Sequence, residues 1–188
     1  MDIVLASGSP RRKELLETLG LEFTICPAKG EECPPQGMGP DETVKALSLA
    51  KAREVAQVYP EALIIAADTI VWADSRILGK PRSEAQAEEM LALLSGSSHE
   101  VYTGVTLICG EKTVCRSECT KVFFRDLSDG EIRAYVKTGE PMDKAGAYGI
   151  QGRAAMMVRR IEGDYFNVMG LPLCALGQML EQIGVQLF

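Results

Sequence analysis

The sequence predicts an α/β fold, and two features indicate it. Strand-like and helix-like patterns alternate along the first half of the chain, at residues 3–6, 10–19, 23–26, 42–58 and 63–72. Two longer β-rich runs, 101–109 and 114–125, are joined by Gly110, Glu111 and Lys112 and form a predicted hairpin. The 188 residues suit one compact domain, residues 1–188, with room for two lobes.

The first strand leads into a small-residue loop and then a helix. Residues 3–6 form a short apolar run, and Ser7, Gly8, Ser9 and Pro10 follow it. Pro10 suits the first helical position and Ser9 the cap before it. Leucines at helical spacing and Gly20 then predict a helix and its end.

Three cations, Arg11, Arg12 and Lys13, occupy the first turn of this helix. Positive charge there opposes the helix dipole and costs stability. A polyanion bound at the loop would explain the arrangement, because a helix N-terminus also presents free N–H groups. A solvated basic patch is the alternative.

Other phosphate-binding or nucleophilic motifs are absent. The chain has no Gly-x-Ser-x-Gly elbow, no Walker loop and no Gly-x-Gly-x-x-Gly after the first strand. Its one histidine, His99, leaves little support for Ser7 or Ser9 as a covalent nucleophile.

The segment 27–40 is a predicted loop, and its carboxylate pair, Glu31 and Glu32, reads first as a solvated acidic surface. Asp41 is the predicted cap of a helix over 42–58. Lys51 falls on the apolar face of that helix. Its stem can be buried while the ammonium stays in water, or the ammonium can point into a cleft.

Asp68 lies in the middle of the most apolar predicted strand, residues 63–72. A buried carboxylate must be ion-paired, metal-bound or protonated, so Asp68 indicates a site more strongly than any other single residue. A structural salt bridge or a strand-end bulge is the alternative.

The remaining elements follow from caps and turns. Residues 74–76 predict a hairpin turn, and Lys80 then lies between Gly79 and Pro81. Ser83 with Gln86 and Ser128 with Glu131 form capping boxes for helices over 84–94 and up to Lys137. The predicted C-terminal elements are a strand at 155–161, a turn at 163–164 leading into 165–168, a helix from Pro172 to its C-cap Gly184, and a closing strand at 185–188.

A glycine-rich segment, residues 140–152, carries Tyr148 and Gln151 between three evenly spaced glycines, Gly146, Gly149 and Gly152. Glycines let a ligand approach the backbone closely. The Gln151 amide offers both a hydrogen-bond donor and an acceptor.

Composition excludes several classes of partner. The net charge of −6 argues against binding to a DNA or RNA polymer or to an anionic membrane surface. We expect neither a signal peptide nor a membrane span. The six cysteines form no Cys-x-x-Cys pair, which predicts reduced thiols in a cytoplasmic protein.

Six stretches, in order along nearly the whole chain, together resemble the Maf family. They are Ser7-Gly8-Ser9-Pro10-Arg11-Arg12, Ala67-Asp68-Thr69-Ile70-Val71, Gly79-Lys80-Pro81, His99-Glu100-Val101-Tyr102-Thr103-Gly104-Val105, residues 143–152 (Asp-Lys-Ala-Gly-Ala-Tyr-Gly-Ile-Gln-Gly) and Gly170-Leu171-Pro172. The resemblance implies the inosine-triphosphatase-like (Maf/Ham1) fold, an α/β protein with a long mixed sheet, flanking helices and a deep cleft between two lobes.

The same resemblance implies a nucleoside triphosphate pyrophosphatase that cleaves the α–β phosphoanhydride and needs a divalent cation (Mg²⁺, Mn²⁺ or Co²⁺). The 143–152 loop resembles the branch acting on dTTP and UTP. The family's link to septum formation implies, as an alternative, a nucleotide-binding regulator with little turnover. A generic phosphohydrolase, releasing orthophosphate, is a third reading. The sequence leaves open whether the chain is a monomer or a homodimer.

The resemblance assigns Asp68 as the proton acceptor. Cations and amides for a triphosphate can come from Ser7 to Arg12, from Lys51 and from Lys80. The expected substrate-binding residues are Ser7, Ser9, Arg11, Arg12, Lys51, Thr69, Lys80 and Gln151, and the expected metal ligands are Asp68 and Glu32. Two alignments stay open: Glu31 or Glu32 as the acidic residue, and Arg11 or Arg12 as the specificity arginine. Glu32 and Arg11 are preferred.

Overall fold

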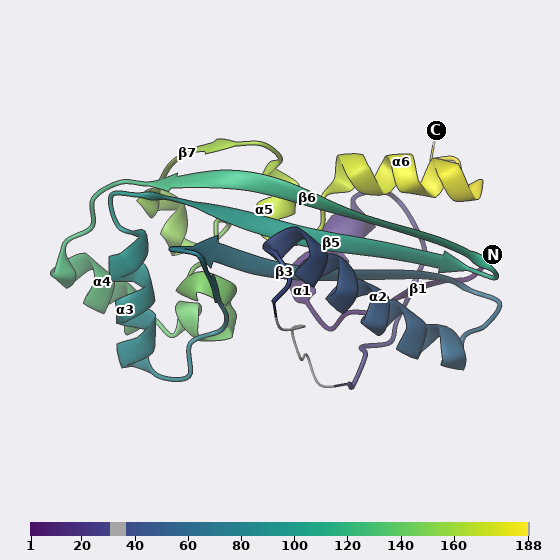
Figure 1. The fold of residues 1–188 in the computed structure, drawn as a ribbon, viewed down its shortest axis with the longest axis horizontal. Helices are drawn as coiled ribbons and strands as arrows, with labels where there is room; N and C mark the ends of the chain where they lie inside the picture. The colour runs from purple at the N-terminus through teal and green to yellow at the C-terminus, as the bar shows by residue number, and fades with distance from the viewer. Residues whose placement is uncertain (31–36, 188) are drawn as a thin grey trace. The chain divides into compact units, whose positions relative to one another are not determined.

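The structure, a computed structural model, describes residues 1–30 and 37–187. Its strands form one seven-stranded mixed sheet in the order β2-β1-β3-β5-β6-β7, with β4 paired to β3 (Figure 1). Strand bounds are β1 Ile3–Leu5, β2 Thr24–Ile25, β3 Leu63–Ala73, β4 Arg76–Leu78, β5 Ser98–Cys109, β6 Lys112–Phe124 and β7 Val158–Glu162. β1 is parallel to β2 and β3, whereas the β3–β4 and β6–β7 pairs are antiparallel. The predicted α/β class and the predicted hairpin are confirmed.

The chain divides into two compact units. Unit 1 contains residues 1–68, 103–118 and 170–188, and unit 2 contains residues 69–102 and 119–169. Strands β3, β5 and β6 each contribute residues to both units. The cleft between two lobes stays a prediction.

Unit 1 is built on β1 and the first half of β3. Its helices are α1 Pro10–Glu17, α2 Pro40–Val58 and α6 Leu173–Ile183 (Figure 1). Val4 and Ala6 pack with Ile64 and Ala66 of β3, and α2 completes this core with Ala52 and Val55. The buried residues of this cluster are alanine, valine and isoleucine, whose compact side chains let the strand face and the helix pack closely.

Helix α2 begins two residues earlier than the sequence suggests. Gly39 occupies the N-cap position and Pro40 the first turn, so the prediction that Asp41 caps the helix is wrong. Proline is pre-organised for the first helical turn, and this preference outweighs the cap. Asp41 instead pairs with Lys45 and accepts a hydrogen bond from Ser117 of β6, and the Lys45 bond is the main reason that its pKa is lowered.

Unit 2 holds the helices α3 Glu84–Leu94, α4 Asp129–Val136 and α5 Tyr165–Met169, and three short 3₁₀ segments, η1 Glu140–Asp143, η2 Ala145–Ala147 and η3 Arg153–Met157. The predicted Ser128–Glu131 capping box is present and reciprocal. At Ser83 only half of the predicted box forms: the Ser83 hydroxyl accepts from the Gln86 amide, whereas the Gln86 side chain accepts from the Arg82 amide.

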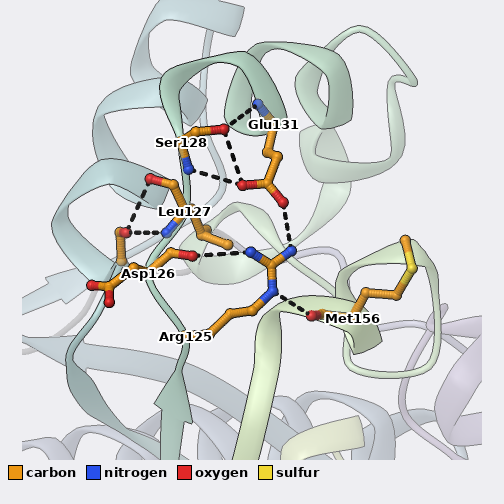
Figure 2. A network of polar contacts seen from close by, with 7 residues as sticks. Arg125, Asp126, Leu127, Ser128, Glu131 and Met156 are labelled. Atoms are coloured by element: carbon orange, nitrogen blue, oxygen red, sulfur yellow. Dashed lines mark hydrogen bonds and ion pairs between the residues drawn. The ribbon is translucent and has the colours of Figure 1, made fainter.

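The end of β6 is tied to this unit by Arg125 (Figure 2). Its guanidinium donates to Glu131 at 2.6 Å and to the Met156 carbonyl at 2.9 Å. The Arg125 bond is the first of the hydrogen bonds that lower the pKa of Glu131 to about 2. One side chain therefore connects a strand end, the capping box of α4 and η3.

The C-terminal predictions are partly wrong. Residues 153–157 form η3, and only 158–162 form the strand β7. Residues 165–169 are the helix α5, and 185–187 form no strand. The last helix ends as predicted, because Gly184 has a φ of 92° and closes it in the left-handed conformation. Among the described residues, no helix combines the length and apolar character that a membrane crossing requires.

Candidate active site

Ser7 and Arg12 form the core of the loop between β1 and α1. The Arg12 guanidinium donates to the Ser7 hydroxyl at 3.1 Å and to the Gly170 carbonyl at 2.8 Å. Ser7 also accepts a hydrogen bond from the Ser9 amide at 3.3 Å and is only 7% exposed. These contacts join two stretches of the resemblance, the serine-arginine loop and the segment that starts at Gly170.

Ser9 is the N-cap residue of α1, as predicted, but its side chain makes no capping bond. Its hydroxyl is therefore available for another acceptor or donor at the helix N-terminus. Arg11 is half-buried in the first turn of α1, next to Arg12. No acidic residue occupies this turn, so the helix dipole and the two arginines make the end of the loop electropositive.

Buried Asp68 and half-buried Lys51 form an ion pair within unit 1. The Lys51 ammonium lies 2.5 Å from Asp68 Oδ1, and the two side chains are 16% and 8% exposed. Of the states open to a buried carboxylate, the structure shows the ion-paired one. Lys51 points from the apolar face of α2 toward β3, so the interpretation of a lysine extended into water is wrong.

Asp68 is an oxygen donor of the kind that a divalent cation binds. Within residues 1–30 and 37–187, no group of three or more His, Cys, Asp or Glu side chains is placed to hold a metal ion. Glu31 and Glu32, the candidates for a second carboxylate, lie outside the described residues. One or two carboxylates with water and substrate phosphates are nonetheless a usual magnesium site, so Asp68 fits that chemistry.

Lys80 and Gln151, two of the predicted residues in unit 2, lie on segments that the structure joins. The Gly146 amide donates to the Gly79 carbonyl at 3.1 Å, which ties the Lys80 loop to the glycine-rich segment. Lys80 is exposed. A Cβ on Gly146 would lie 2.9 Å from Val71 of β3, so the segment packs directly on that strand. Thr69 is half-buried and lies two residues before Val71 in β3, so the two side chains face the same side of the sheet.

Gln151 occupies the tip of a tight turn. The Gly152 amide donates to the Gly149 carbonyl at 3.0 Å, which leaves Ile150 and Gln151 as the central residues. Ile150 is 8% exposed and anchors the turn, whereas Gln151 is exposed. The turn thus presents the amide that the sequence singles out.

The sequence interpretation missed the groups that hold this segment. His99 Nε2 lies 2.7 Å from the Tyr148 hydroxyl, and the His99, Phe124 and Tyr148 rings meet edge to face. Burial lowers the pKa of His99 to about 4, so its ring is neutral at pH 7. His99 and Tyr148 both lie in stretches that resemble the Maf family. Their presence in these motifs was the sequence signal that could have pointed to them.

Solved structures resemble the chain in fold. The Ham1 protein of Staphylococcus aureus matches 97% of this chain and 100% of its own with a TM-score of 0.53 at 14% identity. A HAM1 protein of Coxiella burnetii matches 97% of this chain and 99% of its own with a TM-score of 0.51 at 17% identity. The chain therefore has the Ham1, or inosine-triphosphatase-like, fold.

Proteins related in sequence are much more similar to this chain than these two solved structures are. A Bacillus cytotoxicus protein named dTTP/UTP pyrophosphatase is 52% identical over 179 residues, covering 95% of this chain and 94% of its own length. A Moorella thermoacetica protein of the same name is 52% identical over 189 residues, covering 99% and 97%. The Maf-like protein family matches residues 2–183, and the chain belongs to this family.

Proposed function

We propose that this chain is a nucleoside triphosphate pyrophosphatase that hydrolyses dTTP and UTP to the nucleoside monophosphate and pyrophosphate. Its sequence relatives carry this name at about half identity over nearly their whole length. The observation that carries the proposal is the Asp68–Lys51 ion pair in a unit whose first helix begins with two arginines and no acid.

Asp68 is the proton acceptor in this reaction. A water molecule attacks the α-phosphorus, its proton passes to the Asp68 carboxylate, and the bond to the α–β bridging oxygen breaks. That oxygen leaves with pyrophosphate, so one water is consumed and one anhydride is cleaved. General-base assistance of this kind contributes about 10²–10⁴-fold to a rate.

The cations bind the triphosphate. Arg11 and the Ser9 hydroxyl stand at the open N-terminus of α1, and Lys80 is an exposed ammonium on the loop after β4. Arg12 is held by Ser7 and Gly170, so it meets the substrate in a fixed orientation. Lys51, next to Asp68, neutralises charge close to the attacked phosphorus.

A divalent cation, Mg²⁺, Mn²⁺ or Co²⁺, completes the proposal. Asp68 and Glu32 would hold it, and it would neutralise phosphate charge when bound.

Gln151 selects the base. Its amide pairs with the N3–H of uracil or thymine and with a neighbouring carbonyl, whereas cytosine presents an acceptor at N3 and a donor at position 4. Unpaired buried groups cost about 1–3 kcal/mol each, which is enough to reject CTP. The exposed position of Gln151 at the tip of its turn supports this role.

The test is to incubate the protein with dTTP, UTP, CTP and GTP in the presence of Mg²⁺ and to separate pyrophosphate from orthophosphate. We expect pyrophosphate from dTTP and UTP and little product from CTP or GTP. Orthophosphate would indicate a generic phosphohydrolase, and tight binding without product a regulator. We further propose a cytoplasmic protein, and light scattering would decide between a monomer and a homodimer.

A further inference from the structure

We propose that Glu140 is a positioning residue for base selection, because its carboxylate holds the turn that presents Gln151. The inference rests on the proposed function, since it assigns a second residue to the same base-reading step. It comes from contacts that connect the start of the glycine-rich segment to its end.

The Glu140 carboxylate bridges the backbone at Arg153 and the side chain of Tyr135 on α4. Its Oε1 accepts from the Tyr135 hydroxyl at 3.0 Å, and its Oε2 accepts from the Arg153 amide at 3.2 Å. Tyr135 belongs to α4 and is 5% exposed. Burial, followed by the charge of Glu140, raises the pKa of Tyr135, so the hydroxyl remains a donor at neutral pH. Arg153 lies two residues after Gln151.

The fit between Glu140 and the turn is too close for any side chain at position 152. A Cβ added to Gly152 would lie 2.2 Å from Glu140 Oε1 and 2.6 Å from its carboxyl carbon. The Glu140 carboxylate would have to shift, and we expect this shift to weaken its hydrogen bonds to Tyr135 and Arg153. Gly152 therefore serves this approach, and it also donates to Gly149 to close the turn.

Glu140 is itself fixed at its backbone. Its amide donates to Thr138 Oγ1 at 3.2 Å, and its carbonyl accepts from the Lys144 ammonium at 2.7 Å. Beyond the turn, η3 is tied to β6 through Arg125 and the Met156 carbonyl (Figure 2). Glu140 thus adds a contact that joins the C-terminal end of the turn to α4, and we expect Gln151 to be held less firmly without it.

The experiment compares Glu140→Ala and Glu140→Gln with wild type. Kinetics on UTP and CTP give the ratio of kcat/KM, and amide hydrogen exchange reports on the turn without any substrate. We expect the Ala variant to lose about tenfold or more of the UTP preference, with kcat on UTP reduced less. Exchange at Gly152 and Arg153 should rise. Gln should keep the ratio within about twofold, because its amide can accept from Arg153 and donate to the Tyr135 oxygen.

Two further variants separate positioning from stability. Gly152→Ala should reproduce the Glu140→Ala ratio, and the double variant should be no worse than either single one, since both remove the same contact. Ser128→Ala removes the cap of α4 in the same unit and lowers the melting temperature, but should leave the ratio unchanged.

The outcomes distinguish the two proposals. If Gln151→Ala flattens the ratio and Glu140→Ala leaves it intact, the role of Glu140 is overturned while the pyrophosphatase stands. Unchanged hydrogen exchange at Gly152 and Arg153 in Glu140→Ala also overturns it. A wild-type protein without preference for UTP over CTP overturns base reading itself, and the inference with it.

Discussion

Among single residues, Asp68 carries the strongest prediction. Asp68→Asn is nearly isosteric and should lower kcat by about 10²–10⁴-fold, because an amide cannot accept the proton. The folded state should persist but with a lower melting temperature, since Lys51 loses the counter-ion 2.5 Å away. Steady-state kinetics and thermal unfolding measure the two effects.

A matched control is Asp164→Asn, another carboxylate-to-amide change. Asp164 is half-buried and accepts from the Phe166 amide at 2.8 Å, far along the chain from the proposed chemistry. It should keep turnover. Wild-type kcat in Asp68→Asn would make Asp68 structural and refute the mechanism.

Arg12 and Lys80 should differ in a way that only the structure predicts. Arg12→Ala should raise KM for triphosphates and lower the melting temperature, because bonds to Ser7 and Gly170 are lost along with the charge. Lys80→Ala should raise KM alone, because Lys80 is exposed. Kinetics with thermal unfolding on both variants would test this. The cationic-loop hypothesis fails if KM is unchanged in both.

At the residue scale, the sequence pattern marked Asp68 and Lys51 individually but did not predict that they pair. Asp68 stands out in the sequence as a charge in an apolar strand, and Lys51 stands out as a charge on the apolar face of a helix. Their pairing joins residues 17 positions apart on different elements, which no local pattern encodes. No local pattern marks Glu140, because its partners, Tyr135 and Arg153, lie on opposite sides of it in the chain.

At the scale of elements, Gly104 shows that a glycine in a family motif can be required for packing between a strand and a helix. A Cβ there would lie 2.2 Å from the Val44 carbonyl oxygen of α2 and 2.4 Å from its carbon. The helix backbone therefore rests directly on β5. Gly104→Ala should destabilise the protein by about 1–3 kcal/mol or more, because backbone cannot rotate away as a side chain can.

Gly177→Ala in α6 is the opposite control. Nothing lies within 4 Å of its added Cβ, and alanine favours helix, so stability should rise by about 0.5–1 kcal/mol. Urea unfolding of both variants measures the pair. Equal effects of the two changes would show that the close packing of β5 on α2 is not what Gly104 provides.

Elements with strong local signals were predicted well. The β5–β6 hairpin and the helices capped by Ser83 and Ser128 follow from turns and caps within a few residues. The strand predicted at 155–161 failed at its start, where residues 153–157 turn in 3₁₀ conformation to reach β6. The Arg125 amide bonds the Met157 carbonyl at this point, and such a contact depends on the fold rather than on the segment.

At the scale of the whole molecule, the family resemblance predicted the Ham1-type fold. It did not predict that β3, β5 and β6 are each divided between two units. Strand patterns show that a run is buried but not which partners bury it at each end. The change of unit at Asp68 is therefore invisible in an unbroken apolar run.

The pH dependence of global stability is a last prediction at this scale. His99 is buried, and its pKa is lowered from 6.5 to about 4 by burial. The native state keeps the ring neutral at a pH where the unfolded chain already binds a proton. The contribution of the neutral His99 ring to the free energy of unfolding is therefore complete above pH 6.5. As the pH falls toward 4 this contribution is lost, and the total loss is roughly 3 kcal/mol.

His99→Gln removes the titration while its amide can still bond the Tyr148 hydroxyl, so the two proteins differ mainly in this proton. Urea unfolding of both between pH 4 and 8 gives the difference in unfolding free energy, in which the effects of shared carboxylates cancel. We expect the wild type to lose unfolding free energy relative to the variant as the pH drops below 6.5. Above pH 6.5 the difference between the two proteins should be constant. Parallel stability curves would mean that the His99 ring becomes protonated in the native state as easily as in the unfolded chain.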